Sequence, residues 1–305
     1  MRLLLLSRNA FLYSTGRLVR AARARGHDVE VIDPLELQIA VLRRRPALLR
    51  GGRRLGRFDA VIPRIGVSIT RYGMEVVSQL ELAGTVALNG AEAIGCSRDK
   101  LRALQLLVSS GIRVPRTVCT RSLAGLDGAL ALVGGCPVVV KLQQGAQGIG
   151  TMIADTPQAL RGLIETLWAM GQEIVLQQYV GEAAGNDLRA LVVGGSVVAA
   201  MRRVARPGEF RSNLHRGGTG DPVQLPPRYR RCAIAAAGLV GLEVAGVDML
   251  ETPNGPLVVE LNSSPGLEGI ERASNVDVAA AVIALAEELV APARRGRRRA
   301  RGARS

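Results

Sequence analysis

The chain has 305 residues, 48% hydrophobic and only 3% aromatic, a length that can form two or three domains with complete cores. Its two histidines and four scattered cysteines lack metal-ligand or disulfide spacing, which argues against a zinc site, a His-based triad and a secreted disulfide framework. No apolar run is long enough for a signal peptide or a membrane span, so we expect a cytoplasmic protein.

The formal net charge of +14 is concentrated in two segments, because residues 43–57 and residues 294–305 each hold seven arginines and no acid. The rest of the chain is therefore about neutral. Such segments are typical of arms that bind RNA or another polyanion, but they also occur as solubilising segments without a partner. Both interpretations stay open, and we expect residues 292–305 to form a basic disordered tail.

Residues 1–95 alternate strand and helix patterns, which predicts a small parallel α/β domain. The arginine-rich residues 43–57 are expected to form a loop or a small hairpin. The first strand lacks the GxGxxG that would indicate a dinucleotide-binding domain. Strands are expected at 2–6, 29–32, 59–63 and 85–88, and helices at 15–25 and 73–83.

Arginine supplies all but two of the 40 basic residues, and the two lysines are Lys100 and Lys141. A lysine kept in such a chain indicates a need for a compact point charge, for example on a nucleotide phosphate. Ser97 is predicted to cap a helix that ends at Gly111, which places Lys100 in the first turn. An anion held at that helix end would offset the unfavourable interaction of the lysine with the helix dipole, whereas an exposed surface lysine is the alternative.

Lys141 interrupts the valines of a hairpin predicted over residues 137–154, so its ammonium group must meet an anion or reach solvent. Gly145 and Gly148 follow in a loop whose amide groups could fold over phosphates. This loop is not a P-loop, because GxxxxGK[ST] is absent and the lysine precedes the glycines.

A helix over 156–170 and a strand over 174–180 follow this hairpin. Gln178 and Tyr179, at the end of the strand, offer backbone groups to an adenine edge, or else belong to a plain linker. Further strands are predicted at 187–193 and 196–205, so that Asp187 and Arg189 share one strand face beside Arg202 and Arg203. The chain then continues with a polar loop at 210–220, a helix at 228–241, a hairpin at 244–262, a turn at 264–269 and a last helix at 276–290.

The hairpin at 244–262 carries three polar side chains inside apolar strands. Glu260 and Asn262 are two residues apart and point to one face, and a turn at 252–255 places Asp248 roughly opposite Glu260 on that face. Hard oxygen ligands without histidine or cysteine suit Mg²⁺ or Mn²⁺. An edge hairpin with a solvated polar face is the alternative.

Taken together, several strings resemble the RimK-type glutamate ligases of the ATP-grasp carboxylate–amine ligase family. The resemblance spans nearly the whole chain through LSRNAFLYS, FDAVIPRIG, RDKLRALQLL, VVVKLQQGAQGIG, FRSNLHRGG, VAGVDML and VELNSSPGLEGIE. It implies an N-terminal α/β domain at 1–95 and two ATP-grasp subdomains, of mixed α+β structure, at 96–176 and 177–291. The implied activity is ATP-dependent addition of glutamate to the C-terminal glutamate of a small-subunit ribosomal protein through an acyl phosphate, with two Mg²⁺ or Mn²⁺ ions and a tetrameric assembly.

The resemblance also implies a role for individual residues. Two metal ions would be held by Asp248, Glu260 and Asn262, and Arg203 and Asn213 would act at the reacting phosphoryl or acyl group. The nucleotide would be held by Lys100, Lys141, Gly145, Gly148, Gln178, Tyr179, Asp187, Arg211, Ser212 and Asn213.

The sequence departs from the family pattern at three positions. Gln178 stands where glutamate is usual, Arg202 replaces an acidic residue, and Val204 replaces an arginine. The last two lie on the strand that approaches the acceptor, so they bear on the identity of the acceptor more than on the chemistry. A related ligase with another peptide or carrier-protein acceptor, and a ribosome- or RNA-binding protein with little turnover, are the alternative functions.

Overall fold

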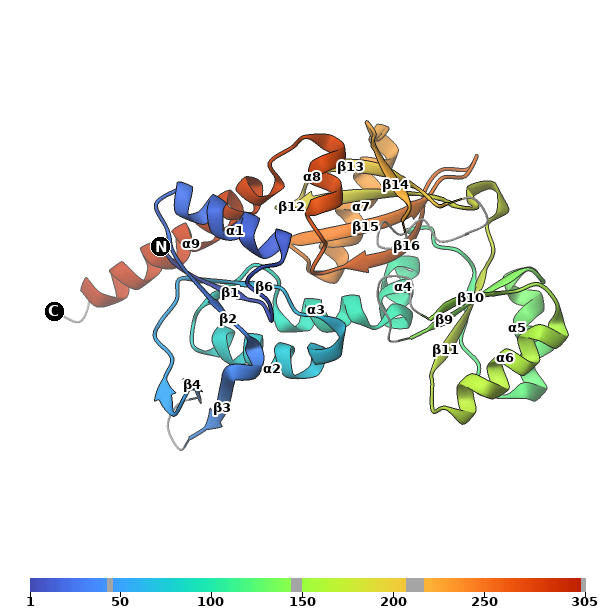
Figure 1. Ribbon diagram of the computed structural model, residues 1–305, viewed down its shortest axis with the longest axis horizontal. Coiled ribbons are helices and arrows are strands. Elements are labelled where there is room, and N and C mark those ends of the chain that lie inside the picture. The colour runs from blue at the N-terminus through green and yellow to red at the C-terminus, as the bar shows by residue number, and fades with distance from the viewer. Residues whose placement is uncertain (43–45, 144–149, 207–216, 303–305) are drawn as a thin grey trace.

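The computed structural model describes residues 1–42, 46–143, 150–206 and 217–302, with only the backbone for residues 293–302. Within these residues the chain forms four β-sheets. The N-terminal parallel sheet lies at one end of an elongated molecule, and two antiparallel sheets lie toward the other end, beside helix α4 (Lys100–Ser109) (Figure 1). None of the described helices is both long and apolar enough to cross a lipid bilayer.

The N-terminal sheet is parallel, with strand order β2-β1-β6-β7. Its strand β1 is buried on both faces, because Leu3 and Leu5 pack into one hydrophobic cluster and Leu4 and Leu6 into another. Such burial explains the uninterrupted apolar run of this strand. The elements are β1 (Arg2–Leu6), α1 (Tyr13–Ala24), β2 (Asp28–Ile32), η1 (Pro34–Glu36), β6 (Ala60–Pro63), η2 (Val67–Ile69), α2 (Thr70–Leu82), β7 (Val86–Ala87) and α3 (Ala91–Arg98). The parallel α/β prediction is confirmed.

The arginine-rich segment forms part of a small antiparallel sheet, in which β4 (Pro46–Arg50) pairs with both β3 (Leu37–Val41) and β5 (Arg53–Arg54). The expected hairpin is therefore present as β4 and β5. Residues 43–45 lie outside the described part of the chain.

The predicted helix cap at Ser97 is wrong. Ser97 lies in the last turn of α3, and its hydroxyl donates to the Ile94 carbonyl. Asp99 is the cap instead, and its carboxylate accepts from the Arg102 amide at 3.0 Å. Aspartate is as good a cap as serine, and the additional helix α3 displaces the start of α4. Lys100 is still in the first turn of α4.

The central sheet has strand order β10-β9-β11-β8, and Lys141 lies on β9 opposite Thr151 of β10. Its strands are antiparallel and two helices pack on it through one hydrophobic cluster. The elements are β8 (Thr117–Val118), η3 (Leu123–Gly125), α5 (Leu126–Val133), β9 (Val138–Leu142), β10 (Thr151–Ala154), α6 (Pro157–Ala169) and β11 (Ile174–Gln178). The predicted hairpin over 137–154 is confirmed at its two strands.

The C-terminal sheet has strand order β14-β13-β12-β15-β16 and is covered on both faces (Figure 1). On β12, Leu188, Ala190 and Val192 pack on the α7 side, while Leu191 and Val193 pack on the side of α8 and α9. The elements are η4 (Gly181–Ala183), β12 (Asn186–Val193), β13 (Ser196–Val204), β14 (Thr219–Pro222), α7 (Pro227–Val240), β15 (Val244–Leu250), β16 (Leu257–Asn262), α8 (Glu268–Ser274) and α9 (Val278–Gly302).

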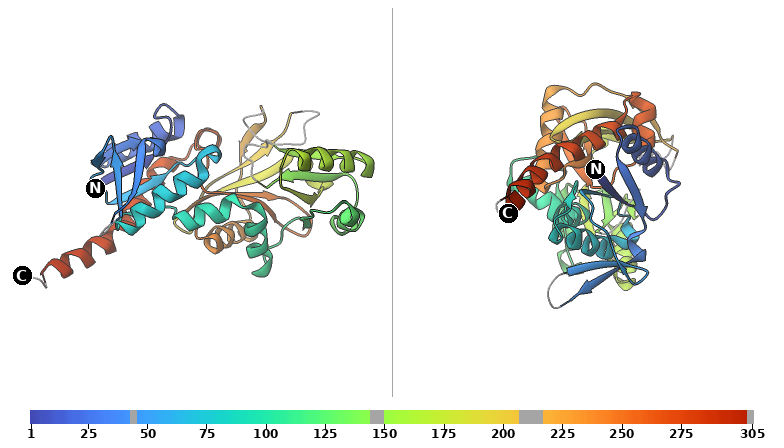
Figure 2. Two further views of the ribbon diagram at one scale, coloured as in Figure 1. Left: turned by 90° about the horizontal axis from the view of Figure 1, so that it is seen from below. Right: turned by 90° about the vertical axis from the view of Figure 1, so that its left-hand side faces the viewer.

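Helix α9 differs from the prediction at its end. We expected the helix to stop at residue 290 and a disordered tail to follow, whereas the helix continues past Pro292 to Gly302 and projects from the body of the molecule (Figure 2). Its first part packs against α1, with Val282, Ile283 and Ala286 buried. Alanine and arginine have high helix propensity, which favours continuation of the helix into the arginine-rich segment.

Asn89 connects the N-terminal part to the C-terminal sheet. Its buried side chain accepts hydrogen bonds from the Glu243 and Val244 amides and donates to the Val244 and Ser263 carbonyls. All four capacities of the amide group are used. This bond set fixes the end of β16 relative to the N-terminal domain.

Candidate active site

Four charged side chains form a continuous row on neighbouring strands of the C-terminal sheet. Arg189 of β12 lies in register with Asp248 of β15 and donates to both carboxylate oxygens at 2.7 Å. Arg203 of β13 lies opposite Asp187, donates to both oxygens of that carboxylate, and reaches Asp248 Oδ2 at 2.9 Å. The order Asp187, Arg203, Asp248, Arg189 therefore alternates negative and positive charge.

This row is largely removed from water, since Arg203 is 3% exposed and Asp248 5% exposed. Burial raises the pKa of Asp248, but the guanidinium groups of Arg189 and Arg203 lower it by more, so the pKa lies well below its usual range. Burial likewise lowers the pKa of Arg203, while Asp248 and Asp187 raise it by more. Asp248 and Arg203 are therefore both charged at neutral pH.

Glu260 and Asn262 lie on β16, the strand next to Asp248 in the C-terminal sheet. Asp248 pairs in register with Glu260, as the sequence predicted, next to an irregularity in the β15–β16 ladder. The Glu260 side chain makes no hydrogen bond or ion pair with any residue that the structure describes. Asn262 Oδ1 accepts one hydrogen bond, from the Ser264 amide at 3.0 Å.

The donor chemistry of these three residues fits a divalent cation. Glu260 has both oxygens available, and Asn262 Oδ1 and Asp248 Oδ1 each accept a single protein hydrogen bond and retain a lone pair. Hard oxygen donors of this kind match Mg²⁺ or Mn²⁺. The described residues contain no cluster of three or more His, Cys, Asp and Glu side chains, so a metal would have to share its coordination shell with Asn262 and with ligand oxygens.

Both lysines approach this carboxylate end from the other parts of the fold. Lys100, at the start of α4, donates from Nζ to the Gln143 carbonyl at 3.3 Å, just after β9. Burial lowers its pKa and the negative charge of Glu260 opposes that effect. Helix α4 also contacts β16 directly. Lys100 therefore lies between the central and C-terminal sheets.

Burial lowers the pKa of Lys141 to about 8. Within this shift, Glu260, Asp248 and Asp187 oppose the effect of burial and Lys100 adds to it, so each of these charges is close enough to act on Lys141. The two lysines that composition singled out thus lie at one site with the predicted metal ligands. The positions of the two lysines suit contacts to phosphate oxygens.

The residues predicted to contact adenine, Gln178 and Tyr179, lie at the end of β11. The Gln178 amide donates to the Arg116 carbonyl at 2.8 Å, so this N–H is already used. The Gln178 side-chain oxygen accepts from the Arg116 amide and from Arg116 Nε, both at 3.3 Å. The Tyr179 amide has no hydrogen-bond partner among the described residues, which leaves it open to a ligand.

The structure describes nine of the predicted residues, of which Gln178 and Tyr179 lie at the end of β11, next to Arg116, and the other seven lie on or beside the charge row. These nine residues are Lys100, Lys141, Gln178, Tyr179, Asp187, Arg203, Asp248, Glu260 and Asn262. Gly145, Gly148, Arg211, Ser212 and Asn213 lie outside the described part of the chain. Arg189 was not assigned to the site from sequence, although its position two residues after Asp187 was the available signal.

Comparison with known proteins gives one consistent relationship. Residues 1–94 match the family described as RimK PreATP-grasp domain, and residues 97–286 match the RimK-like ATP-grasp domain. A probable alpha-L-glutamate ligase of Thioalkalivibrio sulfidiphilus is 49% identical over 96% of this chain and 98% of its own length. A probable alpha-L-glutamate ligase of Pseudoalteromonas atlantica is 51% identical over 93% of this chain and 94% of its own length.

The fold is also that of solved ATP-grasp enzymes. The ATP-grasp ligase PsnB, in a complex with a precursor variant, Mg and ADP, superposes with a TM-score of 0.71 at 23% identity, over 94% of this chain and 98% of its own. This likeness concerns the fold alone. On the two family matches and the relatives near 50% identity, the chain belongs to the RimK-like ATP-grasp family and is an ATP-dependent carboxylate–amine ligase.

Proposed function

We propose that the protein adds glutamate to the C-terminal glutamate of a protein or peptide acceptor, and that the acceptor is a small-subunit ribosomal protein. The observation that carries this proposal is the convergence of Lys100 and Lys141 on the Asp248–Glu260 end of the C-terminal sheet. The naming of the relatives as probable alpha-L-glutamate ligases supports glutamate as the amino acid.

In the proposed reaction an oxygen of the acceptor carboxylate attacks the γ-phosphorus of ATP, and the bond to the β-phosphate oxygen breaks to release ADP. The amine of glutamate then attacks the carbon of the acyl phosphate, phosphate leaves, and the amine loses a proton. Lys100 and Lys141 would hold the phosphate oxygens, and Arg203, fixed by Asp187 and Asp248, would stabilise the charge on the transferring phosphoryl group. The acyl phosphate has to be kept from water until the amine reacts.

Asp248, Glu260 and Asn262 would hold the divalent cations, which supply charge neutralisation at the phosphate oxygens when bound. The Tyr179 amide would donate to the adenine ring, and Asp187 would contact the ribose. Gly145 and Gly148 would close over the phosphates, and Arg211, Ser212 and Asn213 would complete the nucleotide site. These residue roles follow from family membership and from the placement of the described residues.

The test is phosphate release from ATP with Mg²⁺ and glutamate, followed by mass spectrometry of the products. We expect glutamate-dependent release and products that grow by one glutamate at a time when the acceptor is a peptide ending in glutamate. Glu260→Gln should be inactive, and Glu165→Gln, on the exposed side of α6, serves as the matched control. Release that does not depend on glutamate would contradict the proposal.

A ligase with a different acceptor is the second candidate, and β13 favours it. Arg202, where the family usually has an acid, forms an ion pair with Glu251. Because Glu251 balances its charge, Arg202 adds little net positive charge to this strand. Any contact that the usual acidic side chain at this position makes with the acceptor would be absent in this protein. Ligation of glutamate to short peptides or a carrier protein, without ligation to ribosomal protein tails, would favour this candidate.

A further inference from the structure

Two partly buried arginines lie beside the proposed site without an acidic partner. Arg64 follows β6, and its Nη1 donates to the Pro265 carbonyl at 2.8 Å. Arg98 ends α3, and its Nη2 donates to the Ile65 carbonyl at 2.7 Å. Neither arginine forms an ion pair with any residue that the structure describes, and Arg98 Nε is buried without a hydrogen-bond partner.

The two guanidinium groups are close enough to influence each other. Burial, together with the positive charge of Arg98, lowers the pKa of Arg64 to about 10. Burial also lowers the pKa of Arg98, while the negative charge of Glu260 opposes this change. Arg98 in turn lowers the pKa of Lys100. The arginines are thus electrostatically connected to the nucleotide and metal end of the site.

Each guanidinium has five N–H donors, of which the protein uses few. Partly buried cations of like charge that lack anions are unfavourable, and a bound anion would stabilise them. Glu260 is the carboxylate whose charge acts on Arg98, Lys100 and Lys141, and within the described chain it forms no ion pair with Arg98 or Lys141. Among the described residues, Arg64 and Arg98 therefore carry positive charge that no carboxylate neutralises in an ion pair.

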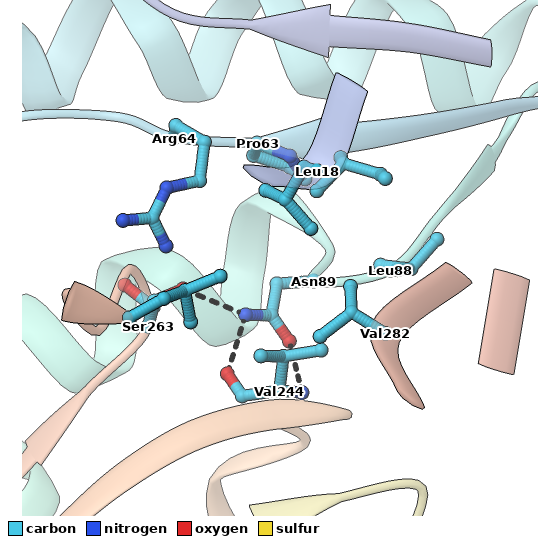
Figure 3. Close-up of a pocket in the computed structure, with 10 residues that line it drawn as sticks. Leu18, Pro63, Arg64, Leu88, Asn89, Val244, Ser263 and Val282 are labelled. Atoms are coloured by element: carbon cyan, nitrogen blue, oxygen red, sulfur yellow. Dashed lines mark hydrogen bonds between the residues drawn. The ribbon is translucent and has the colours of Figure 1, made fainter. Parts of the chain in front are cut away.

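A small cavity adjoins Arg64 at the contact between the N-terminal domain and the C-terminal sheet (Figure 3). Its apolar walls include Leu18, Leu88 and Val244, and its polar groups include Arg64 and Ser263. The Ser263 hydroxyl is buried and has no hydrogen-bond partner among the residues that the structure describes. In Figure 3 the Arg64 guanidinium and Ser263 lie on the same side of the drawn residues, so the polar groups are grouped together beside the apolar wall.

We propose that Arg64 and Arg98 bind a substrate side-chain carboxylate, which does not react, contributed either by the incoming glutamate or by the C-terminal glutamate of the acceptor. The planar fork of a guanidinium matches a carboxylate in a bidentate arrangement, which a lysine cannot reproduce. The site lies on the N-terminal side of the proposed phosphate and metal positions, where the carboxylate would orient the reacting group toward the γ-phosphate. This inference rests on the proposed function, because it takes a carboxylate-bearing amino acid or acceptor as the substrate.

The test compares Arg64→Gln and Arg98→Gln with wild type and with Arg71→Gln, an exposed arginine on α2. Steady-state kinetics are measured with glutamate and with glutamine as the amino acid, and with acceptor peptides that end in glutamate or in glutamine. We expect the preference for the charged member of one pair to fall by about 10- to 100-fold in the two site variants, through KM, and to stay unchanged in Arg71→Gln. The pair that responds identifies the source of the carboxylate.

A purely structural role for the arginines predicts a different pattern. The variants would then weaken charged and neutral substrates by the same factor, or would lower kcat and thermal stability without changing the preference, and either result overturns the proposal. Equilibrium binding of glutamate and of acceptor peptide to the full chain, measured by calorimetry, does not depend on turnover. Wild-type binding without ligation would refute the proposed function alone, whereas equal binding by wild type and both variants would refute the carboxylate site.

Discussion

Removal of Arg203 should destabilise the protein far more than removal of its neighbour Arg202. Arg203 is 3% exposed and bonds Asp187 and Asp248, so Arg203→Met leaves Asp187 without its ion-pair partner inside the sheet. Breaking one side of a buried ion pair costs about 3–5 kcal/mol. In the Arg202–Glu251 pair both side chains are 38% exposed, so Arg202→Met should cost no more than about 1 kcal/mol.

A second substitution distinguishes the cost of the uncompensated Asp187 charge from the cost of lost packing around Arg203. Asp187→Asn in the Arg203→Met background removes the uncompensated carboxylate and should recover about 1–3 kcal/mol of the free energy of unfolding. The free energies would come from urea unfolding followed by far-ultraviolet circular dichroism. If the double variant is no more stable than Arg203→Met alone, or if Arg202→Met is equally costly, the reasoning about the buried charge row is refuted.

The cost of Arg203→Met should also depend on pH. Asp248 has a lowered pKa in the folded protein, so its interaction stabilises the fold above the unfolded-state pKa, which is about 4, and this stability is lost as the pH falls toward the folded-state value. The difference in stability between wild type and variant should therefore be full at neutral pH and should shrink below about pH 4. A difference that grows on acidification would contradict this sign.

Three further predictions concern the site and the basic segment. Glu260→Gln should reduce glutamate ligation below about a tenth of the wild-type rate with unchanged circular dichroism, because it removes the carboxylate that lacks a protein partner, and higher activity would contradict the metal assignment. Since the pKa of Lys141 is lowered to about 8, ATP affinity measured by calorimetry without divalent cations should fall as the pH rises through about 8, and this fall should be absent in Lys141→Met. Deletion of residues 292–305, which carry seven arginines, should weaken binding to a ribosomal RNA fragment more than about tenfold at low salt and leave the ligation rate unchanged, as measured by gel shift and phosphate release.

The sequence was sufficient to predict the pairing of Asp248 with Glu260, because hairpin register depends on a local turn. The Thr252 carbonyl accepts from the Gly255 amide at 2.8 Å, and this turn aligns the two carboxylates. Lys100 and Lys141 were singled out as candidate site residues because they are the two lysines of the chain, and Lys141 also because it interrupts an apolar strand. Each of these predictions depends on residues that are close together along the chain or on a simple count.

Contacts between distant segments could not be predicted. Arg189 and Asp248 are 59 residues apart, and their pairing follows from the order in which β12 and β15 join the sheet. The cap at Asp99 was missed because Ser97 is an equally good cap in isolation, and only the presence of α3 decides between them. The continuation of α9 was missed because a run of arginines also suits a solvated tail.

Charge balance distinguishes structural arginines from candidate ligand-binding ones in a chain where nearly every cation is arginine. Arg17 pairs with Glu271 and Asp277, and Arg203 pairs with two aspartates, so their charges are used within the fold. Arg64 and Arg98 bond carbonyl oxygens, which carry only partial charge, and have no carboxylate within ion-pair distance in the described chain. A carbonyl bond positions a guanidinium without neutralising it, so these two arginines keep a full charge near Lys100, the lysine proposed to bind phosphate. Sequence composition cannot make this distinction, because it depends on which acid lies beside which arginine after folding.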